Sequence, residues 1–210
     1  MPTEKASAEI ERRVTAWHEA GHVVATLISR HFEVNDPAVD FRSNPRGKAF
    51  AGVKKLSGPA PPTVAEAKEL YAIALGGRIA EDTLEAWSRQ AEGRAIYPDD
   101  AGASADLAWA RGLVAHHQFD EELLEEEARN RLAEHLEVVV ELGDRWWRSK
   151  ATQVSRSELL AIPVVAALHA RHPKAKPDPA PAANEPATPP SATTTARGLW
   201  ARLLRFLRVR

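Results

Sequence analysis

The sequence predicts a mainly α-helical domain of about five or six helices that also contains a small β-hairpin or sheet. Several long stretches place apolar residues three and four positions apart, which is the period of one face of an α-helix. Only residues 37–56 alternate apolar and polar side chains, as a half-buried strand does. With 210 residues and 44% hydrophobic content, the chain suits one domain with a packed core plus extensions.

The first predicted helix covers about 24 residues and ends near Arg30 and His31. Its buried face is a stripe with spacings of four and three: Ile10, Val14, Trp17, Gly21, Val24 and Ile28. His18 and His22 lie beside this stripe on one face, because residues four apart differ by about 40° around the helix axis and about 6 Å along it. Glu19 is expected farther round, at the polar edge of the helix.

Two imidazoles on one helical face can share a metal ion, and zinc binds imidazole nitrogen readily. The chain has no cysteine, which excludes disulfides and thiolate zinc sites, so any further ligand is His, Asp or Glu. A catalytic zinc keeps one position for water, and Glu19 can take the proton of that water as general base. The pattern predicts a zinc hydrolase; the simpler alternative is a pair of surface histidines.

The segment after the first helix is predicted to form two strands joined by a turn at residues 44–47. This hairpin covers the core, and an exposed edge could instead pair with an extended substrate. Thr63 and Glu66 then form a capping box that starts a second helix. Gly76 and Gly77 lie inside this helix, where each glycine costs up to about 1 kcal/mol relative to alanine. The pair therefore predicts close approach of another element, with the first helix as the candidate.

Three further helices follow in the second half of the chain. One begins near residue 100, capped by Asp100 or Ser104, and carries Asp106 in its first turns. A long, highly charged helix is predicted from 120 to about 144. A second capping box, which starts at Ser155, precedes a last helix that proline should kink at position 163.

The C-terminal part changes composition, which divides the chain into residues 1–172, 173–196 and 197–210. The middle segment holds seven of the fifteen prolines and predicts a disordered linker. The last fourteen residues carry five arginines and no acid, and they predict a basic amphipathic helix. Leu199 to Arg210 could bind an anionic membrane surface. Docking on the acidic remainder of the chain, or on a partner protein, is the alternative.

The remaining composition bears on location and partners. The N-terminus has no apolar segment of signal-peptide length, and no stretch approaches the roughly 20 apolar residues that span a bilayer. We therefore expect a cytoplasmic protein whose membrane contact is peripheral, at the inner face of the membrane. Apart from its last fourteen residues the chain is acidic, which argues against a nucleic-acid-binding surface.

Three blocks of sequence, in this order, resemble the peptidase domain of the FtsH-type, AAA-linked zinc metalloproteases. They are residues 16–22 (AWHEAGH), 74–81 (ALGGRIAE) and 102–107 (GASADL). The resemblance covers roughly residues 8–170. It implies that domain's mainly helical fold.

The resemblance also implies the site residues. Zinc would be held by His18, His22 and Asp106, and Glu19 would be the general base. Glu81 is the alternative third ligand, because another class of zinc peptidases uses a carboxylate on a following helix.

The family's ATPase module and transmembrane helices should precede this domain, yet only about seven residues precede the first helix. A phosphate-binding loop of the form Gly-x-x-x-x-Gly-Lys-Ser/Thr does not occur in the sequence. We therefore expect a stand-alone zinc metalloendopeptidase that cleaves unfolded proteins or peptides, or is served by an ATPase in trans. The alternative is a non-catalytic zinc-binding adaptor that recruits a partner or a membrane through its C-terminal helix.

Overall fold

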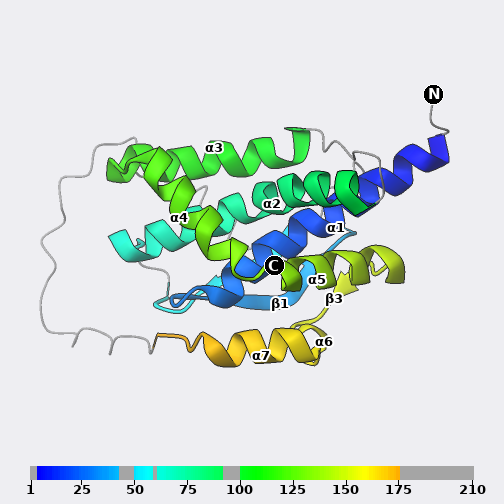
Figure 1. Ribbon diagram of the computed structural model, residues 1–210. Coiled ribbons are helices and arrows are strands. Elements are labelled where there is room, and N and C mark those ends of the chain that lie inside the picture. Colours follow the sequence, from blue (N-terminus) through cyan, green and yellow to red (C-terminus); the bar gives the residue numbers. More distant parts are fainter. Residues whose placement is uncertain (1–3, 43–49, 59–60, 92–99, 176–210) are drawn as a thin grey trace, which may run out of the picture.

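The computed structural model describes residues 4–42, 50–58, 61–91 and 100–175 (Figure 1). The elements follow in the order α1 (Glu4–Ile28), β1 (Phe32–Asp40), β2 (Phe50–Lys55), α2 (Val64–Ala91), α3 (Asp100–His117), α4 (Glu121–Ala133), α5 (Leu136–Ser149), β3 (Gln153–Val154), α6 (Arg156–Leu160) and α7 (Pro163–Arg171). The described chain is mainly helical with a small sheet, which confirms the predicted fold class. Its described part holds seven helices rather than five or six.

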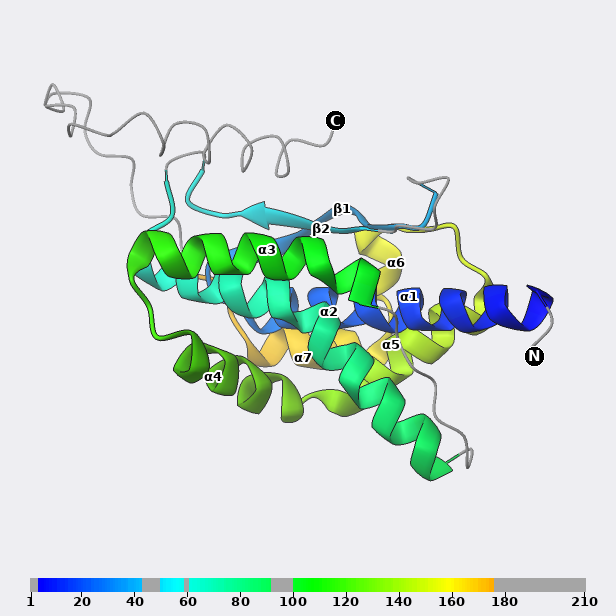
Figure 2. The same cartoon turned by 90° about the horizontal axis from the view of Figure 1, so that it is seen from above.

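Helix α1 lies at the centre of the domain (Figures 1 and 2). It packs against α2, α5, the sheet and α7. The predicted stripe is confirmed, since Trp17, Val24 and Ile28 are buried in the core while Ile10 and Val14 are partly buried against it. Helix α1 therefore brings its two histidines to the junction of several elements.

The sheet is antiparallel with the strand order β2-β1-β3. Strand β1 begins five residues before the predicted position 37, with Phe32 and Val34 both buried. An irregularity in the pairing of β1 with β2 between Val34 and Val39 interrupts the alternation, which hid this start in the sequence. Strand β3 is only two residues long, too short to leave a periodic pattern.

The predicted long helix from 120 to 144 is wrong, because the structure divides it into α4 and α5. Helix α4 ends at Ala133, and His135 is the N-cap of α5. The physical reason is that the two halves bury different faces: α4 packs against α2, whereas α5 packs against α1. One straight helix cannot follow both neighbours.

The predicted kinked last helix is likewise two helices, α6 and α7. Pro163 occupies the first turn of α7, where its missing N–H would have no partner in any case. Helix α3 already begins at Asp100 and contains Ser104, so neither of the two predicted caps precedes the helix. The two capping boxes are confirmed, with Ser155 accepting from the amide of Glu158 and the Thr63 amide donating to Glu66 at 2.7 Å.

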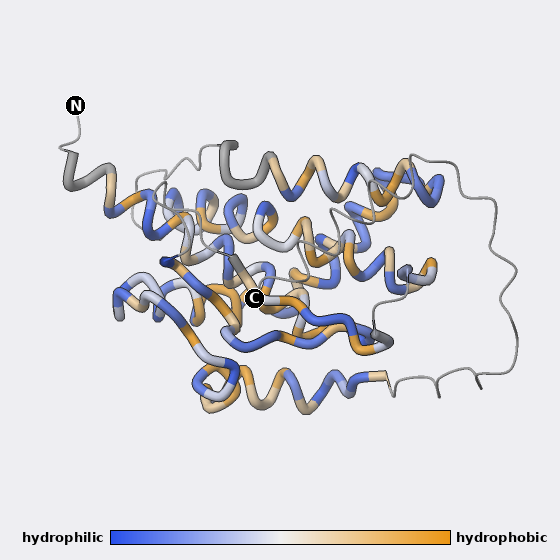
Figure 3. The backbone as a smooth tube through the Cα atoms, turned by 180° about the vertical axis from the view of Figure 1, so that it is seen from behind, coloured by the Kyte–Doolittle hydropathy of each residue, from blue (hydrophilic) through white to orange (hydrophobic). Residues whose placement is uncertain are grey.

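Residues 176–210 lie outside the described residues, so most of the predicted linker and the whole predicted helix from Leu199 to Arg210 remain predictions, as does the division into three parts. The first residues of the predicted linker are described, and the amide of Ala175 donates to the carbonyl of Arg30 at 2.7 Å. Hydrophilic and hydrophobic residues interleave along the described chain (Figure 3). None of its helices combines the length and the apolar character needed to cross a membrane.

Candidate metal centre

The site begins with a close contact between α1 and α2. A Cβ added at Gly21 would clash with the carbonyl oxygen of Gly76, so the two backbones touch where neither residue has a side chain. One residue on, a Cβ at Gly77 would lie 2.5–2.7 Å from three ring atoms of His18. The glycine pair therefore makes room for α1 and for one of its imidazoles, which confirms the close approach predicted from the sequence.

His18, His22 and Asp106 converge on one point. His18 Nε2 lies 2.9 Å from His22 Nε2 and 3.2 Å from Asp106 Oδ2, and His22 Nε2 lies 3.4 Å from the same oxygen. Both imidazoles are buried, and Asp106 comes from α3 with its side chain 24% exposed. Among the described residues, this is the one group of three His, Cys, Asp or Glu side chains close enough to hold a metal ion.

The other ring nitrogens of the two histidines have partners of their own. His18 Nδ1 lies 2.8 Å from Glu81 Oε1, and His22 Nδ1 lies 2.7 Å from the carbonyl oxygen of Ile73. Both partners are acceptors, so each Nδ1 carries the hydrogen and each Nε2 of a neutral ring offers a lone pair. Glu81 thus meets the opposite edge of the His18 ring from Asp106. The structure brings both candidate third ligands to His18, but only Asp106 to the Nε2 atoms.

This donor set fits zinc. Two Nε2 lone pairs 2.9 Å apart beside a carboxylate repel one another unless a positive charge, a proton or a metal ion, lies among them. Zinc takes nitrogen and oxygen ligands at about 2.0–2.1 Å in tetrahedral sites, which separates neighbouring ligand atoms by about 3.3 Å. The three separations in the structure, 2.9, 3.2 and 3.4 Å, bracket that value.

The pKa values of the cluster also reflect the need for a cation. Burial lowers the pKa of His18, but hydrogen bonds to Asp106 and Glu81 outweigh burial and raise it to about 10. Burial raises the pKa of Asp106, but the two histidines outweigh it and hold the pKa well below its usual range. A metal ion would therefore have to displace a bound proton from this cluster.

Glu19 is buried at 4% exposure, which corrects its predicted place at the polar edge of α1. Burial raises the pKa of its carboxyl, against the opposing pull of His18 and His22, and the amide of Ala51 in β2 donates to the carboxylate. The Oε2 atom has no hydrogen-bond partner among the described residues. The sequence could not reveal this burial, because it arises from β2, which lies beside the side of α1 that carries Glu19.

Two contributions to the site were not predicted from the sequence as functional residues. Gly77 left a signal, because a glycine pair inside a helix demands an explanation, but the sequence did not show that its neighbour is the His18 ring. The carbonyl oxygen of Ile73 left none, since any residue supplies a backbone oxygen.

No family model matches the sequence. It is similar to the ATP-dependent zinc metalloprotease FtsH 2 of Methylacidiphilum infernorum (isolate V4), with 31% identity over 125 residues, 56% of this chain and 17% of that protein. It is also similar to the protein of that name from Alkaliphilus metalliredigens (strain QYMF), with 30% identity over 122 residues, 55% of this chain and 16% of that protein. The chain thus spans about a sixth of the length of these relatives. The matches indicate a distant relationship to part of these zinc metalloproteases.

Proposed function

We propose that this chain is a zinc-dependent metalloendopeptidase that hydrolyses peptide bonds in unfolded proteins or peptides. The observation that carries the proposal is the convergence of His18 Nε2, His22 Nε2 and Asp106 Oδ2 beside the buried carboxyl of Glu19. The distant relationship to FtsH-type zinc metalloproteases supports the same chemistry.

In this proposal His18, His22 and Asp106 hold zinc, and zinc when bound supplies a Lewis acid that activates water and polarises the scissile carbonyl. Glu81 acts through His18, whose Nδ1 it holds at 2.8 Å, so that Nε2 keeps its lone pair toward the ligand cluster. The carbonyl of Ile73 does the same for His22 at 2.7 Å. Glu81 is thereby a positioning residue, and Asp106 is the third ligand.

Glu19 is the general base in this mechanism. Its Oε2, which has no hydrogen-bond partner in the described part of the chain, can accept a proton from water as the water oxygen bonds to the carbonyl carbon. When the carbon–nitrogen bond breaks, the same carboxyl returns the proton to the leaving amine. A carboxyl whose pKa is raised by burial suits both steps, because a pKa closer to neutral pH lets the group both take up and release the proton.

Strand β2 lies beside the reacting groups. It is an outer strand of the sheet, and its Ala51 amide donates to the Glu19 carboxylate. An extended peptide could add to this edge through main-chain hydrogen bonds, which would suit an unfolded substrate of varied sequence.

The test is cleavage of unfolded casein and of a peptide library by the purified chain, with Glu19→Gln as the matched variant. We expect cleavage that chelation abolishes and zinc restores, and a Glu19→Gln protein that keeps its zinc but cleaves at least about 10²-fold more slowly. Equal rates for the two zinc-loaded proteins would refute peptidase activity and favour the zinc-binding adaptor. Adding ATP with candidate ATPases asks whether a motor in trans increases the rate.

For the predicted C-terminal helix we propose contact with an anionic membrane through Leu199 to Arg210. Flotation with anionic and neutral liposomes tests this for the full chain against a chain that ends after Ala175. The truncation keeps Lys174 and Ala175 because Lys174 bonds to carbonyls at the end of α1 and Ala175 bonds to the carbonyl of Arg30 just after it. Equal recovery of the two chains on anionic liposomes would exclude the membrane contact.

A further inference from the structure

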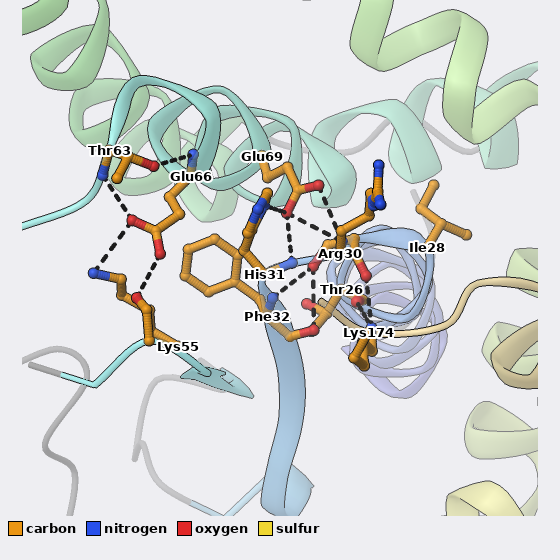
Figure 4. A network of polar contacts seen from close by, with 12 residues as sticks. Thr26, Ile28, Arg30, His31, Phe32, Lys55, Thr63, Glu66, Glu69 and Lys174 are labelled. Atoms are coloured by element: carbon orange, nitrogen blue, oxygen red, sulfur yellow. Dashed lines mark hydrogen bonds and ion pairs between the residues drawn. The ribbon is translucent and has the colours of Figure 1, made fainter. Parts of the chain in front are cut away.

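The C-terminal end of α1 is held by a lysine from the far end of the described chain (Figure 4). Lys174 Nζ donates at 2.9, 3.0 and 2.8 Å to the carbonyl oxygens of Thr26, Leu27 and Ser29. The last carbonyls of a helix lack intrahelical partners and carry the negative end of the helix dipole. An ammonium group satisfies both, so Lys174 acts as a charged cap on α1. The amide of Ala175 adds a bond to the Arg30 carbonyl at 2.7 Å.

Helix α2 holds the opposite side of the same turn (Figure 4). The Glu69 carboxylate accepts from the amide of Arg30 at 3.0 and 3.1 Å and from the amide of His31 at 2.9 Å. It also lies 3.0 Å from Nδ1 of His31. The end of the histidine-bearing helix is therefore clamped between α2 and residues 172–175, which we call the strap.

The strap begins at a contact between two histidines. The His172 ring meets the His135 ring edge-on, with centroids 5.1 Å apart and an interplanar angle of 86°. His135 is 7% exposed, and its Nδ1 has no hydrogen-bond partner among the described residues. His135 is also the N-cap of α5, where the positive end of the helix dipole opposes a further positive charge.

The charged groups around this pair are mostly basic. His172 faces Arg131, Arg171 and Lys174 besides His135. Near His135 are the cations Arg131 and Arg171 and the carboxylates of Glu134 and Glu137, which act in opposite directions on its pKa. Burial lowers the pKa of both histidines below the ordinary value of 6.5. At His172 the neighbouring positive groups add to this effect, whereas at His135 Glu134 and Glu137 oppose burial without overcoming it. A proton on either ring would add positive charge to a site that already holds three cations.

We propose that the strap is an acid-sensitive clamp: neutral His135 and His172 let it dock on the end of α1, and their protonation releases it. The two histidines bind protons more weakly when the strap is docked than when it is free. Docking is therefore complete above the ordinary histidine pKa of 6.5 and weakens as the pH falls below it. Burial lowers the pKa of Lys174 to about 8, so this lysine stays charged on both sides of the transition.

Release would matter for both ends of the clamp. Residues 176–210 continue from Ala175, so release frees the point at which they are attached. On the other side, the Thr26 hydroxyl donates to the His22 carbonyl at 2.8 Å, one turn from the carbonyls that Lys174 holds. The clamp thus links the C-terminal extension to the last turn of α1 without using the metal ligands themselves.

The test is hydrogen exchange of the strap amides in the full chain at pH 7.5 and 5.5, corrected for the intrinsic pH dependence of exchange. Protection of the Ala175 amide should fall at pH 5.5 by up to about tenfold for each histidine, because this pH lies one unit below the ordinary histidine pKa of 6.5. In a His135→Phe/His172→Phe variant, which keeps two aromatic rings that cannot titrate, protection should be equal at the two pH values. His116→Gln, at an exposed histidine near the end of α3, should behave as the wild type.

Further measurements keep the result interpretable. Lys174→Met should lose strap protection at both pH values, which establishes that the signal reports docking, while amides within α1 report whether each variant is folded. NMR titration of the ring protons provides a readout that does not depend on the variants. A pKa of both histidines at or above 6.5, or a fall in protection that is equal in the double variant, would overturn the proposal. So would a fall seen only when zinc is lost from the protein.

Discussion

Gly77 lies where α2 meets the ring of His18, and its replacement by alanine is expected to damage the metal centre while leaving the domain folded. The new Cβ would lie 2.5 Å from Cε1, 2.6 Å from Nε2 and 2.7 Å from Nδ1 of His18. Carbon atoms in favourable contact are about 3.5–4.0 Å apart, so the ring would have to move by about 1 Å. The ring is held between Glu81 and Asp106, so such a movement breaks at least one of these contacts.

The magnitudes separate the effect on stability from the effect on the metal. Overpacking costs about 1–3 kcal/mol, whereas alanine in place of glycine inside a helix contributes up to about 1 kcal/mol. The net loss of stability is therefore about 0–3 kcal/mol, which a domain of this size survives. Loss of ligand orientation typically reduces metal affinity by about 10- to 100-fold. We expect the variant to fold and to bind zinc about 10- to 100-fold more weakly than the wild type.

The assay is zinc competition with a chromophoric chelator, together with thermal unfolding of the metal-free protein. Gly112→Ala is the matched control, because a Cβ at this helical position in α3 would meet no atom of the described residues within 4 Å. The control should bind zinc as the wild type does and be more stable by up to about 1 kcal/mol. Wild-type zinc affinity in Gly77→Ala would refute the proposed role of the glycine and the ring position on which it depends.

Further outcomes are expected at other positions. Asp106→Asn should abolish stoichiometric zinc binding, as measured by elemental analysis, whereas Glu81→Gln should reduce zinc affinity by about 10- to 100-fold. The opposite result would make Glu81 the zinc ligand and Asp106 the positioning residue. Gly143→Ala would drive a Cβ to 2.5 Å from the Trp17 ring and should cost about 1–3 kcal/mol in urea unfolding without changing zinc affinity. Hydrogen bonding to Lys54 and the charge of Arg156 outweigh burial and lower the pKa of Glu33, so Glu33→Gln should cost up to about 1 kcal/mol at pH 7 and nothing at a pH below the folded pKa. An equal cost at both pH values would contradict this pairing.

The central helix and the position of His18 and His22 on one of its faces were accessible from the sequence because both depend on local spacing. The stripe from Trp17 to Ile28 fixed the face on which His18 and His22 had to lie, and the glycine pair of α2 announced a close neighbour. Composition alone did not select Asp106 over Glu81; the family resemblance did. In the structure, Glu81 and Asp106 contact opposite edges of the His18 ring, and this arrangement comes from the packing of α2 and α3.

What the sequence did not predict depends on contacts between distant segments. The break between α4 and α5 follows from their packing against different helices, which a continuous apolar pattern conceals. Glu19 looked polar on a helical wheel but is buried beside β2. Lys174 belonged by composition to a proline-rich linker, yet it caps α1 because the described chain returns there after α7.

The most direct test of the metal centre is zinc analysis of the purified full chain combined with X-ray absorption at the zinc edge. The proposed site predicts one zinc ion per chain, bound at about 2.0–2.1 Å by two imidazole nitrogens and by oxygen ligands that include Asp106. A chain that takes up no stoichiometric zinc, or a bound zinc whose spectrum lacks two imidazoles, would contradict it.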